Sequence, residues 1–351
     1  MTYVENMICD LKREKHGIYL YGAGVLADMI RKLLEKNGVE ISGYLVDEKY
    51  IPIDESNRYI DGKRIFAKKE LDKNAAVVLA IQRGHFQKLN IDPIDDFRAK
   101  YILDLPVAFD VGAFDDLMLI EHKDRLCSLY EKLSDFESRE SLLLFIAQKL
   151  SGMHAKPYSH YPQYFDERIF VPRENETFID CGAYTGDSCI GFFEFLKKNN
   201  IKTYNKCVAF EPDPENFREM EKNLTFYKNI EMLNAGAYEK KDVLHFNSGK
   251  EISSCLDPKG ETIINVDSID NVLNGEEATI IKMDIEGAEL SALKGAEKTI
   301  RKYKPRLAIC VYHKTDDLLT IPDYILSVNP DYKLYFRNYC DAAYEAVLYA
   351  V

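Results

Sequence analysis

The first hundred residues alternate short apolar runs with amphipathic stretches, which is the pattern of strands that alternate with helices. Four apolar runs predict strands, at residues 17–21, 40–46, 75–81 and 101–103. Between the first two runs, apolar side chains recur at helical spacing over residues 25–37, and Gly38 suits the end of that helix. This order predicts a small parallel sheet with helices on its faces.

The alternation stops between residues 106 and 170. Helical periodicity over 115–133 and 137–150 is followed by an irregular stretch, 151–170, that is rich in Tyr, His and Pro. We expect a helical connector and then an aromatic loop. Its tyrosines and His160 either cover a ligand as a lid or pack between domains.

The strand and helix alternation resumes near residue 176. Strands are expected at 177–179, 207–210, 230–234, 278–283 and 306–311, with helices at 185–197, 214–227 and 288–302. The chain ends in two β-rich runs without an intervening helix, which predicts an antiparallel pair on an otherwise parallel sheet. The predicted fold class is therefore α/β with two Rossmann-like domains, at residues 1–105 and 171–351, joined by a connector at 106–170.

The composition and charge of the chain indicate which partners and which cell compartment suit this protein. The chain has 351 residues and a net charge of -12, which disfavours nucleic acid as a partner because phosphates need clustered Lys and Arg. Its eight cysteines form no C-x-x-C pair, as is usual for free thiols in a reducing compartment. The first residues lack the pattern of a signal peptide, and no apolar run is long enough to span a membrane. We expect a cytoplasmic protein, and the sequence leaves its oligomeric state open.

The glycine-rich turn after the strand at 177–179 carries the first candidate chemistry. Asp180 and Asp187 bracket this turn and would repel a pyrophosphate, whereas Gly182 and Gly186 allow close approach of the backbone to a ligand. A cationic nucleoside such as S-adenosylmethionine suits such a turn better. Glu211 ends the next strand, where an acid can accept hydrogen bonds from both ribose hydroxyls.

Acidic residues and a histidine follow the next two predicted strands. Asp284, Glu286 and Glu289 come directly after one strand, and His313 follows the other. The two glutamates also suit a helix start, where the dipole favours negative charge. His313 is our first choice for a general base and Asp284 the second. A metal held by Asp284 and Glu286 would lack a third ligand, so the sequence predicts no metal site.

Several segments resemble the FkbM family of S-adenosylmethionine-dependent methyltransferases, over residues 160 to 351. They are Tyr164-Phe165, the turn at 180–187, Glu211-Pro212 and the run at 283–289. The resemblance implies a class I methyltransferase sheet of seven strands with the last one antiparallel, and O-methylation of a hydroxyl. It places Asp284 near the methyl group. Together with our own reasoning from the residues, this makes His313, Asp284 and Glu286 the catalytic candidates. The resemblance also implies that Asp180, Gly182, Ala183, Gly186 and Glu211 line the cofactor, and that Gly236 and Ala237, at the end of the third strand, lie beside the adenine. The predicted cofactor site consists of these residues and their neighbours Tyr184, Asp187 and Pro212.

The N-terminal turn has the opposite electrostatics. Gly22 and Gly24 match a dinucleotide-binding turn, with Asp47 at the distance of a ribose-binding acid. Residues 17–50 and 61–65 resemble the N-terminal domain of PglD-type sugar acyltransferases, which implies a nucleotide or nucleotide-sugar site. The alternative is a turn retained only for packing.

The expected function is O-methylation of a sugar, nucleotide-sugar or related small metabolite. Two rivals remain open, an NAD-dependent oxidoreductase that uses the N-terminal turn and a noncatalytic sugar-binding protein.

Overall fold

We describe a computed structural model of the chain. It describes residues 3–72, 74–81, 101–102, 116–151, 159, 161–247, 255–256, 262–340, 343 and 345–351. The chain divides into two compact units, Met1–Glu121 with Ile146–Ala155, and His122–Phe145 with Lys156–Val351. Our division at residues 105 and 170 stays a prediction. His160, which we expected in an aromatic loop, lies outside the described residues.

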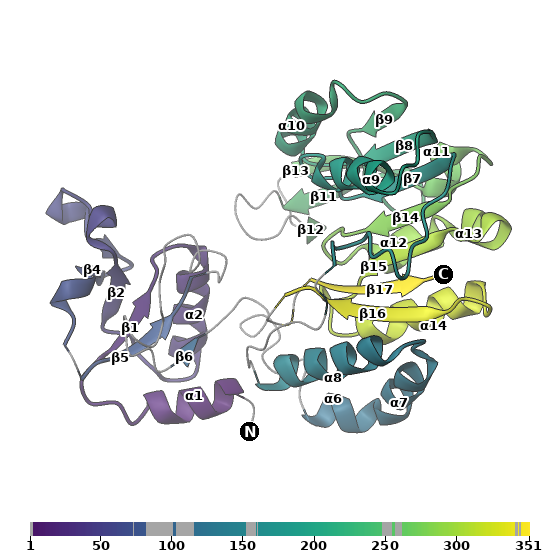
Figure 1. Cartoon of the computed structure of the whole chain (residues 1–351). Helices are drawn as coiled ribbons and strands as arrows, with labels where there is room; N and C mark the ends of the chain where they lie inside the picture. Colours follow the sequence, from purple (N-terminus) through teal and green to yellow (C-terminus); the bar gives the residue numbers. More distant parts are fainter. Residues whose placement is uncertain are drawn as a thin grey trace. The chain divides into compact units, whose positions relative to one another are not determined.

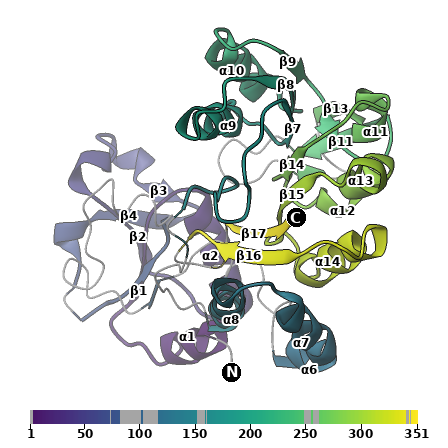
Figure 2. The ribbon, with the colours of Figure 1, turned by 45° about the vertical axis from the view of Figure 1, so that its right-hand side comes forward.

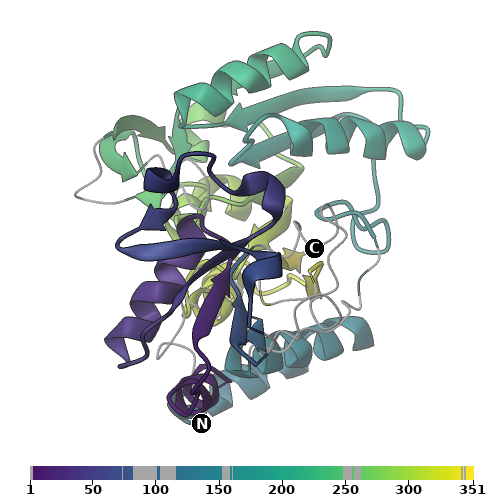
Figure 3. The same cartoon turned by 90° about the vertical axis from the view of Figure 1, so that its left-hand side faces the viewer.

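The first unit contains a six-stranded sheet in the order β3-β4-β2-β1-β5-β6. Its strands, which face the viewer in Figure 3, are β1 (Ile18–Tyr21), β2 (Gly43–Val46), β3 (Tyr59–Ile60), β4 (Lys63–Ala67), β5 (Ala76–Leu79) and β6 (Tyr101–Ile102). All neighbours are parallel except the β3–β4 hairpin, so the predicted parallel core is confirmed. We had not predicted β3 and β4, which are short and half-exposed.

The helices of the first unit are amphipathic. Helix α2 buries its apolar stripe, Leu26, Ile30 and Leu34, as its spacing predicts. The bounds are α1 (Tyr3–Leu11), α2 (Val25–Lys36) and α6 (Asp116–Glu121), with short 3₁₀ turns η1 (Glu48–Tyr50), η2 (Glu55–Asn57) and η3 (Lys68–Glu70). Helix α1 was not predicted. The likeness of this unit to a nucleotide-binding domain stays a prediction.

The second unit contains a seven-stranded sheet in the order β16-β17-β15-β14-β7-β8-β9. Figure 1 shows these strands stacked from β9 at the top to β16 at the bottom. Their bounds are β7 (Glu176–Cys181), β8 (Tyr204–Phe210), β9 (Ile230–Leu233), β14 (Ile280–Met283), β15 (Arg306–Cys310), β16 (Leu334–Asn338) and β17 (Ala346–Ala350). Strand β17 is antiparallel to both of its neighbours. The predicted seven-stranded sheet with an antiparallel end is therefore confirmed.

Helices cover both faces of this sheet. Figure 2 shows α9 and α10 on one side and α11 to α14 on the other. The bounds are α7 (Lys123–Lys132), α8 (Phe136–Ser151), α9 (Asp187–Lys198), α10 (Pro214–Leu224), α11 (Ile269–Leu273), α12 (Glu289–Lys294), α13 (Glu297–Tyr303) and α14 (Asp317–Val328). Every residue of β14 and β15 is buried, as expected for central parallel strands covered on both faces. Among the described helices, none is long and apolar enough to cross a membrane.

This unit also contains a second, four-stranded sheet, which we had not predicted from the sequence. Its strands lie in the order β10-β13-β11-β12, with bounds β10 (Gly236–Ala237), β11 (Asp242–Asn247), β12 (Cys255–Leu256) and β13 (Thr262–Asp267). We had placed Gly236 and Ala237 at the end of the third strand of the large sheet, and this is wrong. That strand, β9, ends at Leu233, and the two residues instead pair with Val266 and Asp267.

A buried arginine fixes the edge of the large sheet. Arg337 on β16 is fully buried, and its guanidinium donates to Asp135 Oδ2 at 2.7 Å and to Ser138 Oγ at 2.7 Å. Asp135 lies between α7 and α8, and Ser138 lies in the first turn of α8. A buried charge is tolerated only when it is paired and hydrogen-bonded, so this network holds the start of α8 against the last hairpin of the sheet.

Candidate active site

The turn between β7 and α9 brings the backbone unusually close to the neighbouring strand end. Gly182 has a φ of +78°, and a Cβ at this position would lie 1.9 Å from the carbonyl oxygen of Asp284. Gly186, at a φ of +89°, forms the N-cap of α9. Tyr184 also adopts a positive φ, and its side chain is more than half exposed. Only glycine satisfies the first position, because a side chain there would overlap the backbone of Asp284; the close approach of this turn to a ligand stays a prediction.

Glu211 is fixed beside this turn. It follows the last residue of β8, is only 5% exposed, and accepts the backbone N–H of Tyr184 at 2.9 Å and that of Asp213 at 2.9 Å. Burial raises the pKa of Glu211 to about 7, although the two amide donors act in the opposite direction. Each carboxylate oxygen keeps a further lone pair that can accept a ligand hydroxyl.

Asp180 does not present a free charge to the turn. Its side chain is fully buried, and Lys282 Nζ on β14 lies 3.0 Å from its Oδ1, an ion pair without hydrogen-bond alignment. The same ammonium donates to the carbonyl oxygen of Gly182 at 2.7 Å. Burial lowers the pKa of Lys282, but Asp180 and Asp284 outweigh it and raise that pKa overall. We had expected the negative charge of Asp180 to disfavour a pyrophosphate and to favour a cationic ligand at this turn. Because Lys282 compensates that charge, Asp180 does not support this expectation.

The remaining members of the predicted cofactor set are distributed around the turn. Ala183 is buried, whereas Asp187 is exposed in the first turn of α9, where the helix dipole favours its charge. Pro212 follows Glu211, and a Cβ on Gly236 would lie 3.8 Å from its ring. The start of β10 thus borders the segment that follows β8. The cofactor roles of these residues stay predictions.

Asp284 is held from two sides by tyrosine hydroxyls. Tyr164 donates to its Oδ2 at 2.7 Å and Tyr312 to its Oδ1 at 3.2 Å. Burial works to raise the pKa of Asp284, but the charges of Lys282 and His313 and the Tyr164 hydrogen bond lower it overall. The carboxylate is therefore ionised and fixed in orientation, at the carboxyl end of β14.

His313 lies among three carboxylates. Its side chain is 7% exposed, with Nδ1 2.9 Å from Glu289 Oε1, and Nε2 3.4 Å from Asp284 Oδ1 and 3.6 Å from Glu286 Oε2. Burial lowers the pKa of His313, but the neighbouring carboxylates, Glu289 first, raise it to about 9. The imidazole is thus protonated at neutral pH. Its predicted role as a base requires that ligand binding first remove this proton.

The two glutamates of the cluster differ in access. Glu289 is the first residue of α12, fully buried, and accepts the backbone N–H of Ile285 at 2.9 Å. Glu286 keeps 40% of its side chain exposed, and burial of the rest raises its pKa to about 7. Glu286 is therefore the carboxylate of this cluster that an acceptor molecule reaches most readily.

Two partners of the cluster come from distant parts of the chain; the family resemblance included Tyr164 without giving it a role, and nothing in the sequence indicated Glu345. Tyr164 lies far before β14 in the chain, and Glu345 far after it, next to β17. Gln163 donates to Glu345 at 2.5 Å, and the pKa of Glu345 is raised by burial and by the charge of Asp284. Lys282 did have a signal, since it is a lone charge in an otherwise apolar strand.

In the first unit, the three predicted residues lie at one edge of the sheet. Gly22 follows β1, Gly24 is the N-cap of α2, and Asp47 follows β2. Gly22 has a φ of +121°, and a Cβ there would lie 2.5 Å from the carbonyl oxygen of Ala80, whereas Gly24 faces open space. Packing alone therefore explains Gly22, while Gly24 and Asp47 leave room for the predicted nucleotide.

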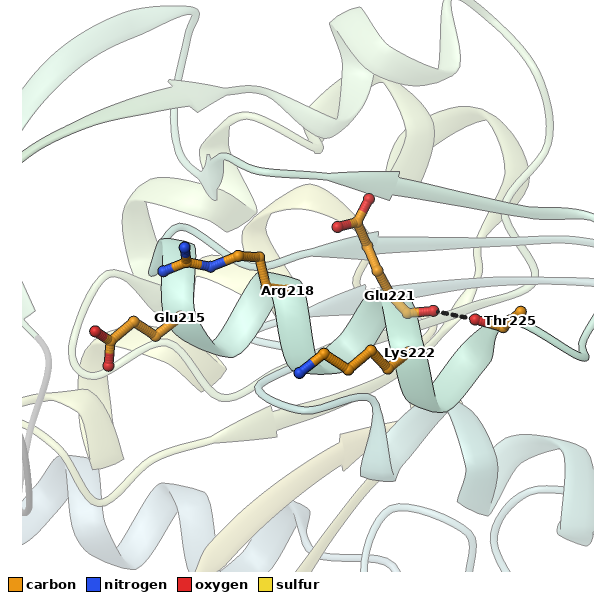
Figure 4. A pocket seen from close by; sticks show the side chains of 5 residues that line it. All are labelled: Glu215, Arg218, Glu221, Lys222 and Thr225. Atoms are coloured by element: carbon orange, nitrogen blue, oxygen red, sulfur yellow. Dashed lines mark hydrogen bonds between the residues drawn. The ribbon is translucent and has the colours of Figure 1, made fainter.

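A shallow hollow on the surface of α10 is not a candidate site. Figure 4 shows that its lining comes from α10 and the residue that caps it, namely Glu215, Arg218, Glu221, Lys222 and Thr225. All five are exposed, and the hydroxyl of Thr225 donates a hydrogen bond to the carbonyl oxygen of Glu221 at 2.7 Å. Mixed charges on one helix are typical of a solvated surface.

Part of the chain, including the acids that follow β8 and β14, matches a known protein family. Residues 180–329 match the methyltransferase FkbM domain. The matched FkbM segment begins at Asp180, includes Glu211 and the whole cluster from Asp284 to His313, and ends just after α14. It covers less than half of the chain, and the first unit lies outside it.

One solved structure has the same fold. The crystal structure of methyltransferase FkbM from Methylobacillus flagellatus KT is 23% identical, with a TM-score of 0.72, and the match covers 99% of this chain and 93% of that one. The fold is thus shared over both units. An rRNA methylase from Streptococcus thermophilus matches 50% of this chain and 86% of its own, with 14% identity and a TM-score of 0.33.

Fibrillarin from Aeropyrum pernix, in complex with natively bound S-adenosyl-L-methionine, matches 51% of this chain and 67% of its own, with 11% identity and a TM-score of 0.33. Among curated proteins, no match was found.

Proposed function

We propose that this protein transfers a methyl group from S-adenosylmethionine to a hydroxyl group. The observation that carries the proposal is Glu211, a buried carboxylate held by two backbone amides directly beside a glycine turn that tolerates no side chain at Gly182. Both features lie at the carboxyl ends of adjacent parallel strands, where open α/β sheets bind ligands. The match of residues 180–329 to the FkbM domain supports the same reaction class.

The binding site for the cofactor follows from these positions. Glu211 would accept the ribose hydroxyls, and the backbone at Gly182 and Gly186 would lie against the amino acid part of the ligand. Pro212, Gly236 and Ala237 would border the adenine. Asp180 would act through Lys282, because the ion pair fixes the ammonium that in turn holds the carbonyl oxygen of Gly182.

The acids beyond β14 would supply the negative surroundings that a sulfonium needs. Asp284 is ionised and held by two tyrosines, and Glu286 and Glu289 follow it closely in the chain. When bound, the cofactor supplies the electrophilic methyl group. The protein would hold the acceptor oxygen in line with it, and positioning of this kind lowers a barrier by several kcal/mol.

The proton of the acceptor would pass to this cluster. Glu286 is the most exposed of its acids and faces His313, so we assign it contact with the acceptor hydroxyl. His313 and Asp284 would position it, and the base role we predicted for His313 would apply only after loss of its own proton.

The acceptor we propose is a sugar, a nucleotide-sugar or a related small metabolite. This rests on the N-terminal turn, where Gly24 is unobstructed and Asp47 lies at the end of the adjacent parallel strand. The rival functions are an NAD-dependent oxidoreductase that uses this same turn, and a noncatalytic sugar-binding protein.

Calorimetry with the full chain separates these functions. We expect the chain to bind S-adenosylmethionine and S-adenosylhomocysteine. Glu211→Ala should weaken the affinity for both by about tenfold or more, because the variant loses at least one hydrogen bond to a charged acceptor. Glu215→Ala, an exposed acid on α10, is the matched control and should change nothing. Binding of NAD alone would favour the oxidoreductase. Binding of UDP-sugars alone would favour the noncatalytic protein. An unchanged affinity in Glu211→Ala would remove Glu211 from the ribose role.

A further inference from the structure

Three groups of the kind that bind metal ions converge beyond β14 and β15. Asp284, Glu289 and His313 each offer one ligand atom, and these atoms all lie within 4.8 Å of one another. Asp284 directly follows β14, Glu289 begins α12, and His313 lies in the loop after β15. The sequence does not predict this set of ligands, because no pattern in it indicates that Glu289 lies next to His313.

Buried atoms in this cluster lack hydrogen-bond partners. The side chain of His313 is only 7% exposed, yet neither ring nitrogen makes an aligned hydrogen bond. Glu289 is fully buried, and its Oε2 is also without a partner. Such atoms are rare in folded proteins and call for a ligand or ion, because an unsatisfied buried polar group is costly. One ligand atom of each residue lies within 4.8 Å of a carboxylate oxygen of Asp284.

We propose that Asp284, Glu289 and His313 bind one divalent transition-metal ion, Mn²⁺ or Zn²⁺. One ligand atom from each of the three residues lies within 4.8 Å of the other two, which is close to the separations of about 3–4 Å between ligands of an ion bound at about 2.1 Å. Two carboxylates with one imidazole favour such an ion over Mg²⁺ or Ca²⁺, which prefer oxygen ligands alone.

Charge and outer hydrogen bonds support the same site. Lys282 is paired with Asp180, and an ion bound to His313 would displace the proton of the imidazole, so the carboxylates of Asp284 and Glu289 would then balance the added cation. Tyr164 and Tyr312 orient Asp284, and the N–H of Ile285 orients Glu289. Ligands held in this way are typical of metal sites, where outer hydrogen bonds fix the orientation of each ligand.

The ion-binding proposal stands on these residues alone. Its use in methyl transfer rests on the proposed function, since the ion would bind the acceptor oxygen and favour its deprotonation. In that arrangement Glu286, which is not one of the three ligands, remains free to take the proton.

The test is a titration of the chelator-treated full chain with Mn²⁺, in which electron paramagnetic resonance counts the free ion. We expect one saturable site per chain, with competition by Zn²⁺. Glu289→Gln and His313→Ala should each weaken binding by about 30-fold or more, since even outer-layer substitutions cost about 10- to 100-fold. Glu215→Gln removes an exposed acid on α10, outside the cluster, and should stay within about threefold of the parent chain.

Two results would overturn the proposal. One is the absence of saturable Mn²⁺ or Zn²⁺ binding in the unaltered chain, which decides the question even where a variant fails to fold. The other is equal binding by the parent chain and the two ligand variants. S-adenosylhomocysteine binding, measured in parallel without metal, reports on the proposed function separately. Loss of one activity with retention of the other therefore shows which proposal has failed.

Discussion

Replacement of Lys282 by Met tests how the buried charges beneath the glycine turn are balanced. The ammonium is 3% exposed and pairs with Asp180, whose side chain is fully buried. Removing one partner of a buried ion pair costs about 3–5 kcal/mol, because the other charge stays buried without compensation. The variant also loses the hydrogen bond to the carbonyl oxygen of Gly182, worth about 1 kcal/mol. We therefore expect Lys282→Met to destabilise the second unit by about 3–5 kcal/mol.

The double variant isolates the pair. Asp180→Asn alone should also destabilise, but Lys282→Met combined with Asp180→Asn should cost clearly less than the sum, by about 2 kcal/mol or more. Lys206→Met is the control. Lys206 pairs with Glu231 at 2.7 Å but keeps 29% of its side chain exposed, so its loss should cost no more than about 1 kcal/mol.

The assay is urea denaturation followed by circular dichroism, with and without S-adenosylhomocysteine. A ligand stabilises only the unit that binds it, so the transition that shifts with the ligand reports on the second unit. Strictly additive costs, or a Lys282→Met cost no larger than that of the control, would refute the pairing. Because Lys282 compensates Asp180, we also expect Asp180→Asn to leave the preference between S-adenosylmethionine and S-adenosylhomocysteine nearly unchanged.

Two further predictions concern the turn and its acid. Gly182→Ala should destabilise the second unit by at least about 2 kcal/mol, because a Cβ at this positive φ would overlap the carbonyl oxygen of Asp284. Gly275→Ala is the control, since Gly275 has a φ of +89° but faces open space, and it should cost only about 1 kcal/mol. Thermal or urea unfolding measures both free energies. Equal costs would contradict the close approach. The affinity for S-adenosylhomocysteine should fall as pH drops through about 7, the raised pKa of Glu211, because the ribose needs the ionised carboxylate, and it should level off at higher pH. Calorimetry from pH 5.5 to 8.5 measures this, and a flat profile would argue against Glu211 as the ribose ligand.

The sequence by itself determined the large features of the second unit. The carboxyl ends of buried strands carry Asp180, Glu211 and Asp284, and a terminal pair of β-rich runs without a helix predicted the antiparallel end of the sheet. These signals are local, because a strand's period and its last polar residue are written in adjacent positions. The four-stranded sheet at 236–267 was missed, since two of its strands are only two residues long and carry no period.

Only the tertiary structure decided the chemistry of the site. Lys282 compensates Asp180, Tyr164 and Tyr312 hold Asp284, and Glu289 meets His313, all through contacts between separate strands and helices. No spacing in the chain encodes such contacts. Burial then sets the charge states, raising the pKa of Glu211 to about 7 while neighbouring carboxylates raise that of His313 to about 9. Local patterns fix which edge of the sheet carries the reactive groups, and three-dimensional packing fixes which of those groups are charged, paired or free to bind.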